Sequence, residues 1–207
     1  MTKRLEFIFD FASLNAYLAY RALPQILERT GARLVINPCL LGGIFKATGN
    51  QAPAIAFAPI KGKFEYEMLE LRRFVARHRF EKFRLNPHFP VNTLMLMRVL
   101  VAAQEAGSGS AFLEMGLEGM WEEGLKLDDK EVLARRIDAA GLDSAKLLAA
   151  DQSDPVKQKL ADNTAAAVAR GVFGVPTFFV GGEMFFGKER LGQVEEAVEA
   201  QTAQAAS

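Results

Sequence analysis

The stretch FDFASLNAYLAYRALPQI, residues 9–26, decides the fold, because it passes directly from an apolar strand into a helix. The alternation of apolar and acidic side chains from Leu5 to Phe11 predicts the strand. Ser13 is a typical helix N-cap, and the apolar residues after it recur at helical spacing. Pro24 lies inside that pattern and predicts a kink or a division of the helix, since it has no N–H to donate.

Further along the chain, the sequence predicts three more strands and a last helix. RLVINPCL, residues 33–40, is typical of a second strand and completes a βαβ unit. PTFFV and EMFF, residues 176–180 and 183–186, surround Gly181-Gly182 and predict a hairpin. A last helix is expected from Lys188 to about Ala200.

The long stretch between these parts has no convincing strand pattern and reads as several helices. The order predicts an α/β protein with a thioredoxin-like fold, β-α-β … β-β-α, and a large all-helical insertion. We expect residues 1–41 and 172–207 to form the thioredoxin-like domain, and residues 42–171 to form the helical insertion domain.

Composition excludes several classes of function. The chain of 207 residues has 25 basic and 25 acidic side chains, so we expect no nucleic-acid partner. No apolar run reaches about 18 residues, and we expect no membrane partner. Cys39 is the only cysteine, so neither an internal disulfide nor a cysteine-based metal site is expected. We read the protein as cytoplasmic and metal-free, with Cys39 as a small buried apolar side chain.

Ser13 occupies the place where redox proteins of this layout carry a reactive cysteine. The N-terminus of a helix presents unpaired N–H groups and a positive dipole end, which favour an anion. The four positions from Ser13 to Ala16 contain no cysteine, which excludes dithiol exchange. Ser13 could instead receive the thiol of another molecule and donate its hydroxyl hydrogen to the sulfur. The alternative is that Ser13 only caps the helix.

Two later stretches favour the binding of a thiol peptide. Val175-Pro176 opens the predicted hairpin, where a thioredoxin-like protein has a cis-proline whose preceding residue pairs with a bound peptide such as glutathione. A trans proline that opens the strand is the alternative. The stretch Phe186-Gly187-Lys188-Glu189-Arg190-Leu191 begins the last helix and could hold the γ-glutamyl end of glutathione, with Glu189 on its amino group and either Lys188 or Arg190 on its carboxylate. A charged first turn exposed to water is the alternative there.

Longer motifs, in this order around a helical insertion, resemble the 2-hydroxychromene-2-carboxylate isomerase family. That family is similar to κ-class glutathione transferases and belongs to the DsbA-like thioredoxin superfamily. The resemblance covers nearly the whole chain and rests on FDFAS (9–13), LLGGIFKATGN (40–50), NPHFPVNTLMLMR (86–98), MWEEG (120–124) and FGVPTFFVGGEMFFGKERL (173–191).

The resemblance implies site residues and a cofactor. Ser13 resembles the serine that activates the glutathione thiol. The segments Val175-Pro176 and Phe186 to Glu189 resemble the glutathione cradle. Gly49-Asn50 match a pair that faces the organic substrate, and Asn92 lies in a second stretch near that pocket. Glutathione is therefore the implied cofactor.

Two positions depart from the family pattern. The family commonly has Ser-Pro where this chain has Ser13-Leu14, and often Asp where this chain has Glu189. Leu14 lacks the fixed first-turn φ of proline, but the Ser13 hydroxyl remains.

The implied activity is a glutathione-dependent isomerisation of an aromatic, electrophilic small molecule by reversible thiolate addition. The substrate class is 2-hydroxychromene-2-carboxylate or a related intermediate of aromatic catabolism. A κ-like glutathione transferase and a non-catalytic glutathione- or peptide-binding protein are the alternatives. Such folds commonly form a homodimer, which is a further expectation. The basic run from Arg72 to Arg84 is predicted to be a solvated helix face, although one of its arginines could meet a substrate carboxylate.

Overall fold

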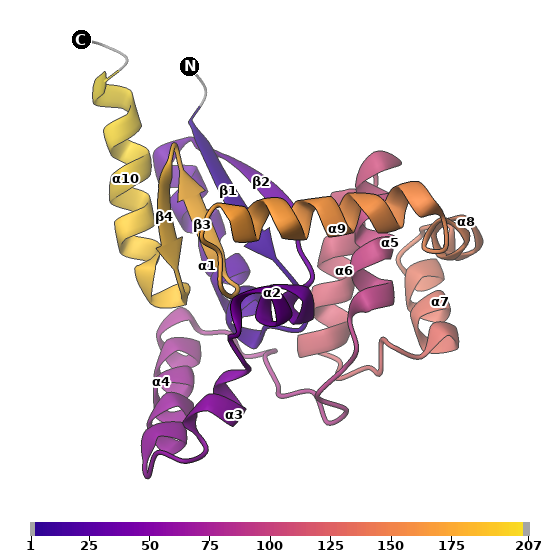
Figure 1. The fold of residues 1–207 in the computed structure, drawn as a ribbon, viewed down its shortest axis with the longest axis horizontal. Helices are drawn as coiled ribbons and strands as arrows, with labels where there is room; N and C mark the ends of the chain where they lie inside the picture. The colour runs from indigo at the N-terminus through magenta and orange to yellow at the C-terminus, as the bar shows by residue number, and fades with distance from the viewer. Residues whose placement is uncertain (1–2, 205–207) are drawn as a thin grey trace.

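A four-stranded sheet in the order β2-β1-β3-β4 forms the centre of the computed structural model, which describes residues 3–204 (Figure 1). The strands are β1 (Arg4–Phe9), β2 (Arg33–Pro38), β3 (Thr177–Val180) and β4 (Glu183–Phe186). β1 pairs in parallel with β2 and antiparallel with β3, and β3 pairs antiparallel with β4. The predicted βαβ unit and hairpin are confirmed. β1 ends two residues earlier than predicted, because the Asp10 side chain turns back to accept from the N–H of Ala12.

The first helix, α1 (Leu14–Thr30), has a defined cap at each end. Ser13 has an extended backbone and caps the first turn with its side chain. Gly31 adopts the left-handed conformation, with φ of 66°, and donates its N–H to the carbonyl of Leu27 at 2.8 Å. The helix continues through Pro24, so the division considered from the sequence is wrong. Packing of the buried face of α1 against the sheet outweighs the missing hydrogen bond.

Helices and turns make up the chain from residue 42 to residue 171, as predicted. The helices between β2 and β3 are α2 (Leu41–Thr48), α3 (Pro53–Phe57), α4 (Lys63–His78), α5 (Leu94–Glu105), α6 (Gly109–Trp121), α7 (Lys130–Ala139), α8 (Ser144–Ala150) and α9 (Asp154–Ala169). After β4, a 3₁₀ turn, η1 (Lys188–Arg190), precedes α10 (Leu191–Gln204). The last predicted helix therefore begins as a tighter turn and extends beyond Ala200.

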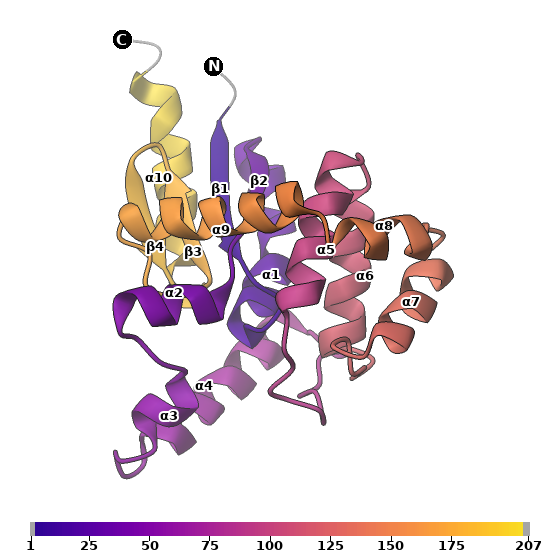
Figure 2. The ribbon, with the colours of Figure 1, turned by 45° about the vertical axis from the view of Figure 1, so that its right-hand side comes forward.

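Each face of the sheet is covered by a different pair of helices. α1 and α10 cover one face of the sheet, and α2 and α9 cross its other face (Figures 1 and 2). Phe178 points into the core under α1 and stacks on Phe7 at a ring distance of 4.8 Å. Phe179 points to the other face, where it packs with Ile8 and with Ile44 of α2. The alternation along β3 thus divides the buried residues into two layers.

The remaining helices take two different positions. α5 to α8 lie beside the β2 edge of the sheet and share its larger core, where Phe11 contacts Phe112 at a ring distance of 6.3 Å (Figure 1). α3 and α4 project from the end of the molecule at which β1 and β2 terminate (Figure 2). Ile55, Ile60 and Tyr66 of this projection are more than half exposed. The N-terminus of α1 lies at the same end of the molecule.

Candidate functional site

Ser13 joins the start of α1 to the loop before β3. Its Oγ accepts a hydrogen bond from the N–H of Ala16 at 3.1 Å, which confirms the predicted N-cap. The same hydroxyl donates to the carbonyl oxygen of Val175 at 3.1 Å, across 162 positions of sequence. The hydroxyl hydrogen therefore already points at the backbone of the residue before Pro176.

The loop that receives this bond is held from both sides. The Val175–Pro176 peptide bond is cis, as the thioredoxin-like reading required. Thr177 donates its hydroxyl to the carbonyl of Gly174 at 2.7 Å. Gly187 donates its N–H to the carbonyl of Pro176 at 2.9 Å, so the start of the expected glutathione cradle lies beside the proline.

Asn50 reaches the same loop from α2. Its Nδ2 donates to the carbonyl of Phe173 at 2.7 Å, and its Oδ1 accepts from the N–H of Gln51 at 2.8 Å. Gly49 ends α2 in the left-handed conformation, with φ of 71°, and this turn directs Asn50 toward the loop. Ser13 and Asn50 thus both form hydrogen bonds to the same short segment, residues 173–175.

Asn92 lies at the start of α5. Its side-chain oxygen accepts from the N–H of Leu94 at 3.0 Å, and its own N–H donates to Asp128 at 3.4 Å. Its neighbour Thr93 connects this segment to the Ser13 loop, because the Thr93 hydroxyl donates to Asp10 at 2.7 Å. Asn92 is therefore connected to the Ser13 loop through its neighbour Thr93, whose hydroxyl is bonded to the buried carboxyl of Asp10.

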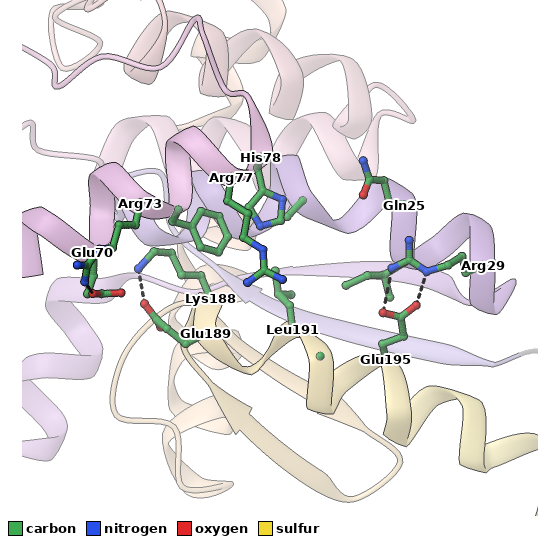
Figure 3. A pocket seen from close by; sticks show the side chains of 14 residues that line it. Gln25, Arg29, Glu70, Arg73, Arg77, His78, Lys188, Glu189, Leu191 and Glu195 are labelled. Carbon is green, nitrogen blue, oxygen red and sulfur yellow. Dashed lines mark hydrogen bonds and ion pairs between the residues drawn. The ribbon is translucent and has the colours of Figure 1, made fainter.

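The other residues of the expected cradle lie in two different places: Phe186 lies beside the loop before β3, and Lys188 and Glu189 line a separate cavity. The ring of Phe186 packs on Phe173 at 4.5 Å and lies beside Gly174, where an added Cβ would come within 3.0 Å of it. Lys188 is 5% exposed and forms an ion pair with Glu189. These two side chains line a cavity between α1, α4 and α10 (Figure 3), whose lining contains neither Ser13 nor Val175.

Asp10 is the residue that sequence reasoning missed. It is fully buried at the end of β1 and accepts hydrogen bonds from three segments. The N–H of Ala12 donates at 2.9 Å, the N–H of Leu41 at 2.7 Å and the hydroxyl of Thr93 at 2.7 Å. One carboxyl group thereby joins the Ser13 loop, the start of α2 and the start of α5. A single acidic residue between the phenylalanines of FDFAS was the available signal.

Burial also changes the acidity of Asp10. Removal from water raises the pKa of the carboxyl to about 6, and the three hydrogen bonds oppose that rise. A second buried contact supports the same loop, because the indole N–H of Trp121 donates to the carbonyl of Phe11 at 3.0 Å. The backbone just before Ser13 is therefore held by hydrogen bonds to two buried side chains, those of Asp10 and Trp121.

Cys39 has no access to this site. It is fully buried after β2, as predicted, and its sulfur lies 3.4 Å from the carbonyl of Asn163. Burial, with smaller contributions from Asp10 and Glu6, raises the pKa of the thiol to about 12. A protonated, enclosed thiol is not a nucleophile.

These features define a thioredoxin-fold protein in which a serine hydroxyl stands where a redox protein has a thiol. The comparison with family models agrees with that class. The model of the DSBA-like thioredoxin domain matches residues 4–199, and the chain belongs to that family.

Similar proteins come from two named groups. The chain is 28% identical over 197 residues to 2-hydroxychromene-2-carboxylate isomerase of Pseudomonas putida, covering 94% of this chain and 93% of that one. It is 28% identical over 199 residues to glutathione S-transferase kappa 1 of Rattus norvegicus, covering 90% of this chain and 87% of that one. A solved structure of 2-hydroxychromene-2-carboxylate isomerase superposes with a TM-score of 0.81 at 27% identity, covering 98% of each chain.

No helix within residues 3–204 combines the length and the apolar composition needed to cross a bilayer. In the same part of the chain, no three His, Cys, Asp or Glu side chains gather in an arrangement that could hold a metal ion.

Proposed function

We propose that the protein is a glutathione-dependent isomerase. It would interconvert 2-hydroxychromene-2-carboxylate and trans-o-hydroxybenzylidenepyruvate, or a related intermediate of aromatic catabolism. The observation that carries the proposal is the Ser13 hydroxyl, which caps α1 and donates to the Val175 carbonyl at 3.1 Å. The named isomerases and kappa transferases among the similar proteins support the same class of chemistry.

The residues around Ser13 fit a bound thiol peptide. Glutathione, when bound, would supply the thiolate that adds to an electrophilic carbon and later leaves it. Val175 presents a backbone carbonyl at the site, and that carbonyl is occupied by Ser13. A peptide N–H that pairs with this carbonyl would compete with Ser13 and release the hydroxyl hydrogen. Ser13 could then donate to the sulfur, while the N-terminus of α1 stabilises its negative charge.

Other residues would orient the two molecules. Gly187 is joined to Pro176, so the backbone from Phe186 to Glu189 would cradle the γ-glutamyl end. Lys188 and Glu189 are paired with each other and would exchange that pair for the charged ends of glutathione. Gly49, Asn50 and Asn92 would face the organic substrate. Asn50 would also position the loop, through its bond to the Phe173 carbonyl.

The gain in reactivity follows from the acidity of the thiol. A free cysteine thiol has a pKa of about 8.5, and only a few per cent is thiolate at neutral pH. A pKa near neutrality would make the thiolate about half of the population. The α1 terminus and one hydroxyl donor together are of the right magnitude for that shift.

The test is a calorimetric titration with reduced glutathione, followed by turnover assays, on four forms of the protein. Ser13→Thr keeps both the cap and the hydroxyl donor, and we expect binding and turnover close to wild type. Ser13→Asp keeps the cap but cannot donate to the thiolate, and Ser13→Ala removes both. We expect turnover to fall at least about tenfold in these two variants, the value of one hydrogen bond to a charged group.

Stability measurements separate chemistry from folding. Loss of the cap in Ser13→Ala is expected to lower the free energy of unfolding by about 1 kcal/mol, whereas Ser13→Asp retains the cap. Turnover by Ser13→Asp equal to that of wild type would exclude the thiol-activating role. An absence of glutathione binding by the wild type at millimolar concentration would overturn the proposal as a whole.

A kappa-like transferase is the second candidate, because the rat kappa enzyme is as similar in sequence as the isomerases are. A transferase releases a stable thioether, whereas an isomerase regenerates free glutathione. Mass spectrometry after incubation with a benzylidenepyruvate separates the two outcomes. Glutathione binding without acceleration of any electrophile would indicate a non-catalytic binding protein. The cytoplasmic location and the homodimer stay predictions.

A further inference from the structure

A cavity of about 390 Å³ lies along the flank of α1, between that helix, α4 and the start of α10 (Figure 3). This volume is within the usual range of small-molecule sites. Ala22, Ile26, Phe74 and Leu191 give it apolar walls. None of the residues that join at the Ser13 site, namely Ser13, Asn50 and Val175, lines it.

The charges around the cavity do not balance. It is lined by four permanently cationic side chains and three carboxylates. Each carboxylate is paired with a cation: Glu195 with Arg29, Glu70 with Arg73 and Glu189 with Lys188. Arg77 is the fourth cation. Among residues 3–204, no carboxylate forms an ion pair with Arg77. One positive charge therefore remains for a ligand.

Arg77 is an exposed residue that lines the cavity. Arg77 extends from α4 toward Leu191, with the ring of His78 beside it (Figure 3). His78 packs on Phe74 at a ring distance of 4.3 Å and on Phe80 at 5.3 Å. Burial, and then the charge of Arg77, lower the pKa of His78, which disfavours the charged imidazole. Aromatic side chains thus line the cavity beside Arg77, and the carboxylates of the lining are each paired with another cation.

We propose that this cavity binds an organic monocarboxylate with a compact apolar body. The carboxylate would take two parallel hydrogen bonds from the Arg77 guanidinium, whose planar fork matches it. The apolar body would lie between Phe74 and Leu191. The cavity shares Lys188 and Glu189 with the proposed glutathione cradle, but the proposal does not require their ion pair to open. It does not depend on the proposed function.

The first test is a calorimetric titration with phenylacetate, with phenylacetamide as the uncharged probe. We expect saturable binding of phenylacetate only. Arg77→Gln is expected to weaken that binding by about ten- to a hundredfold, the value of hydrogen bonds to a charged group. Arg72→Gln is the matched control, because Arg72 is exposed on the same helix but does not line the cavity; its affinity should stay within about twofold of wild type.

A second variant fills the cavity without changing its charge. Gly192 lines the cavity, has no positive φ, and a Cβ added there meets no atom within 4 Å. Gly192→Leu should therefore abolish phenylacetate binding without lowering the melting temperature. Unchanged affinity in this variant or in Arg77→Gln would overturn the proposal, as would no binding by the wild type.

The Ser13→Ala variant separates this site from the proposed active site. Phenylacetate binding should persist in that variant, because Ser13 does not line the cavity, and loss of binding there would refute a separate site. Phenylacetate binding by a protein that binds no glutathione would support this inference and sink the proposed function.

Discussion

The two ends of α1 are held by different kinds of interaction. At the N-terminus, Asp10 and Trp121 are buried and bond the backbone that leads to Ser13. Along the C-terminal half, the side chains facing the cavity form ion pairs at the surface, and Arg29 of the pair with Glu195 is 54% exposed in its side chain. The first end is built from buried hydrogen bonds and the second from solvated charges.

This difference predicts where the molecule tolerates change. When a buried polar group loses its hydrogen-bond partner, the free energy of unfolding falls by a large fraction. An exposed ion pair contributes little to that free energy. The geometry around Ser13 should therefore be sensitive to single substitutions. The exposed, ion-paired side chains around the cavity, such as Arg29, can be exchanged with little effect on folding.

Trp121→Ala should have the largest effect. The side chain is 1% exposed and its N–H bonds the Phe11 carbonyl, so its removal leaves a cavity and an unpaired acceptor. We expect the free energy of unfolding to fall by about 3–5 kcal/mol in urea denaturation. Phe89→Ala is the control, because Phe89 contacts the same ring at 5.9 Å but is 51% exposed. Equal losses in the two variants would contradict the comparison.

Asp10→Asn should remove a pH dependence of stability. Burial holds the pKa of Asp10 at about 6 in the folded protein, above the ordinary value of 3.8. The folded state therefore binds a proton that the unfolded chain has lost, and wild-type stability falls as the pH rises from about 4 to about 6. The total change is about 3 kcal/mol for a shift of about two pKa units. Denaturation curves at pH 4, 5, 6 and 7 measure it.

Asp129→Asn is a control of opposite sign. Hydrogen bonds from the N–H groups of Val132 and Glu131 lower the pKa of the exposed Asp129 carboxyl. Its contribution to stability is present above its ordinary pKa and is lost as the pH falls. A wild-type stability that does not fall between pH 4 and pH 6 relative to Asp10→Asn would show that Asp10 is not buried as described.

The smallest effect is expected for the pair of Arg29 and Glu195. A double-mutant cycle with Arg29→Gln and Glu195→Gln should give a coupling energy below about 1 kcal/mol, which decreases further in salt. The pair of Arg21 and Glu122 is the reference, since its side chains are only 21% and 10% exposed and lie 2.7 Å apart. A larger coupling for the exposed pair would remove the contrast between the two ends of α1.

Local patterns in the sequence were sufficient for the elements and for the centre of the site. Alternation predicts the strands, Ser13 marks the start of α1, and Val175-Pro176 marks the loop that the Ser13 hydroxyl contacts. The division at Pro24 was wrong because tertiary packing, which a local rule does not contain, keeps the helix intact.

Features that depend on long-range packing were not visible in the sequence. Two of the three partners of Asp10, Leu41 and Thr93, lie 31 and 83 positions further along the chain, so no spacing rule identifies them. The first turn after β4 suggested that Lys188 and Glu189 face a peptide, but in the structure the two side chains pair with each other, and the Lys188 ammonium lies 5.3 Å from the ring centre of Phe74 in α4. The sequence shows that Lys188 and Glu189 are charged, but it does not show which group each of them pairs with.

The enclosure of Cys39 gives the protein a reporter of its own opening. Its sulfur lies against the Asn163 carbonyl of α9, and the chain has no other cysteine. A disulfide reagent can react with it only after α9 separates from the end of β2. The rate of thiol labelling in the unmodified protein would therefore measure how often this layer detaches, and the same measurement with ligand present would show whether a molecule bound elsewhere slows that event.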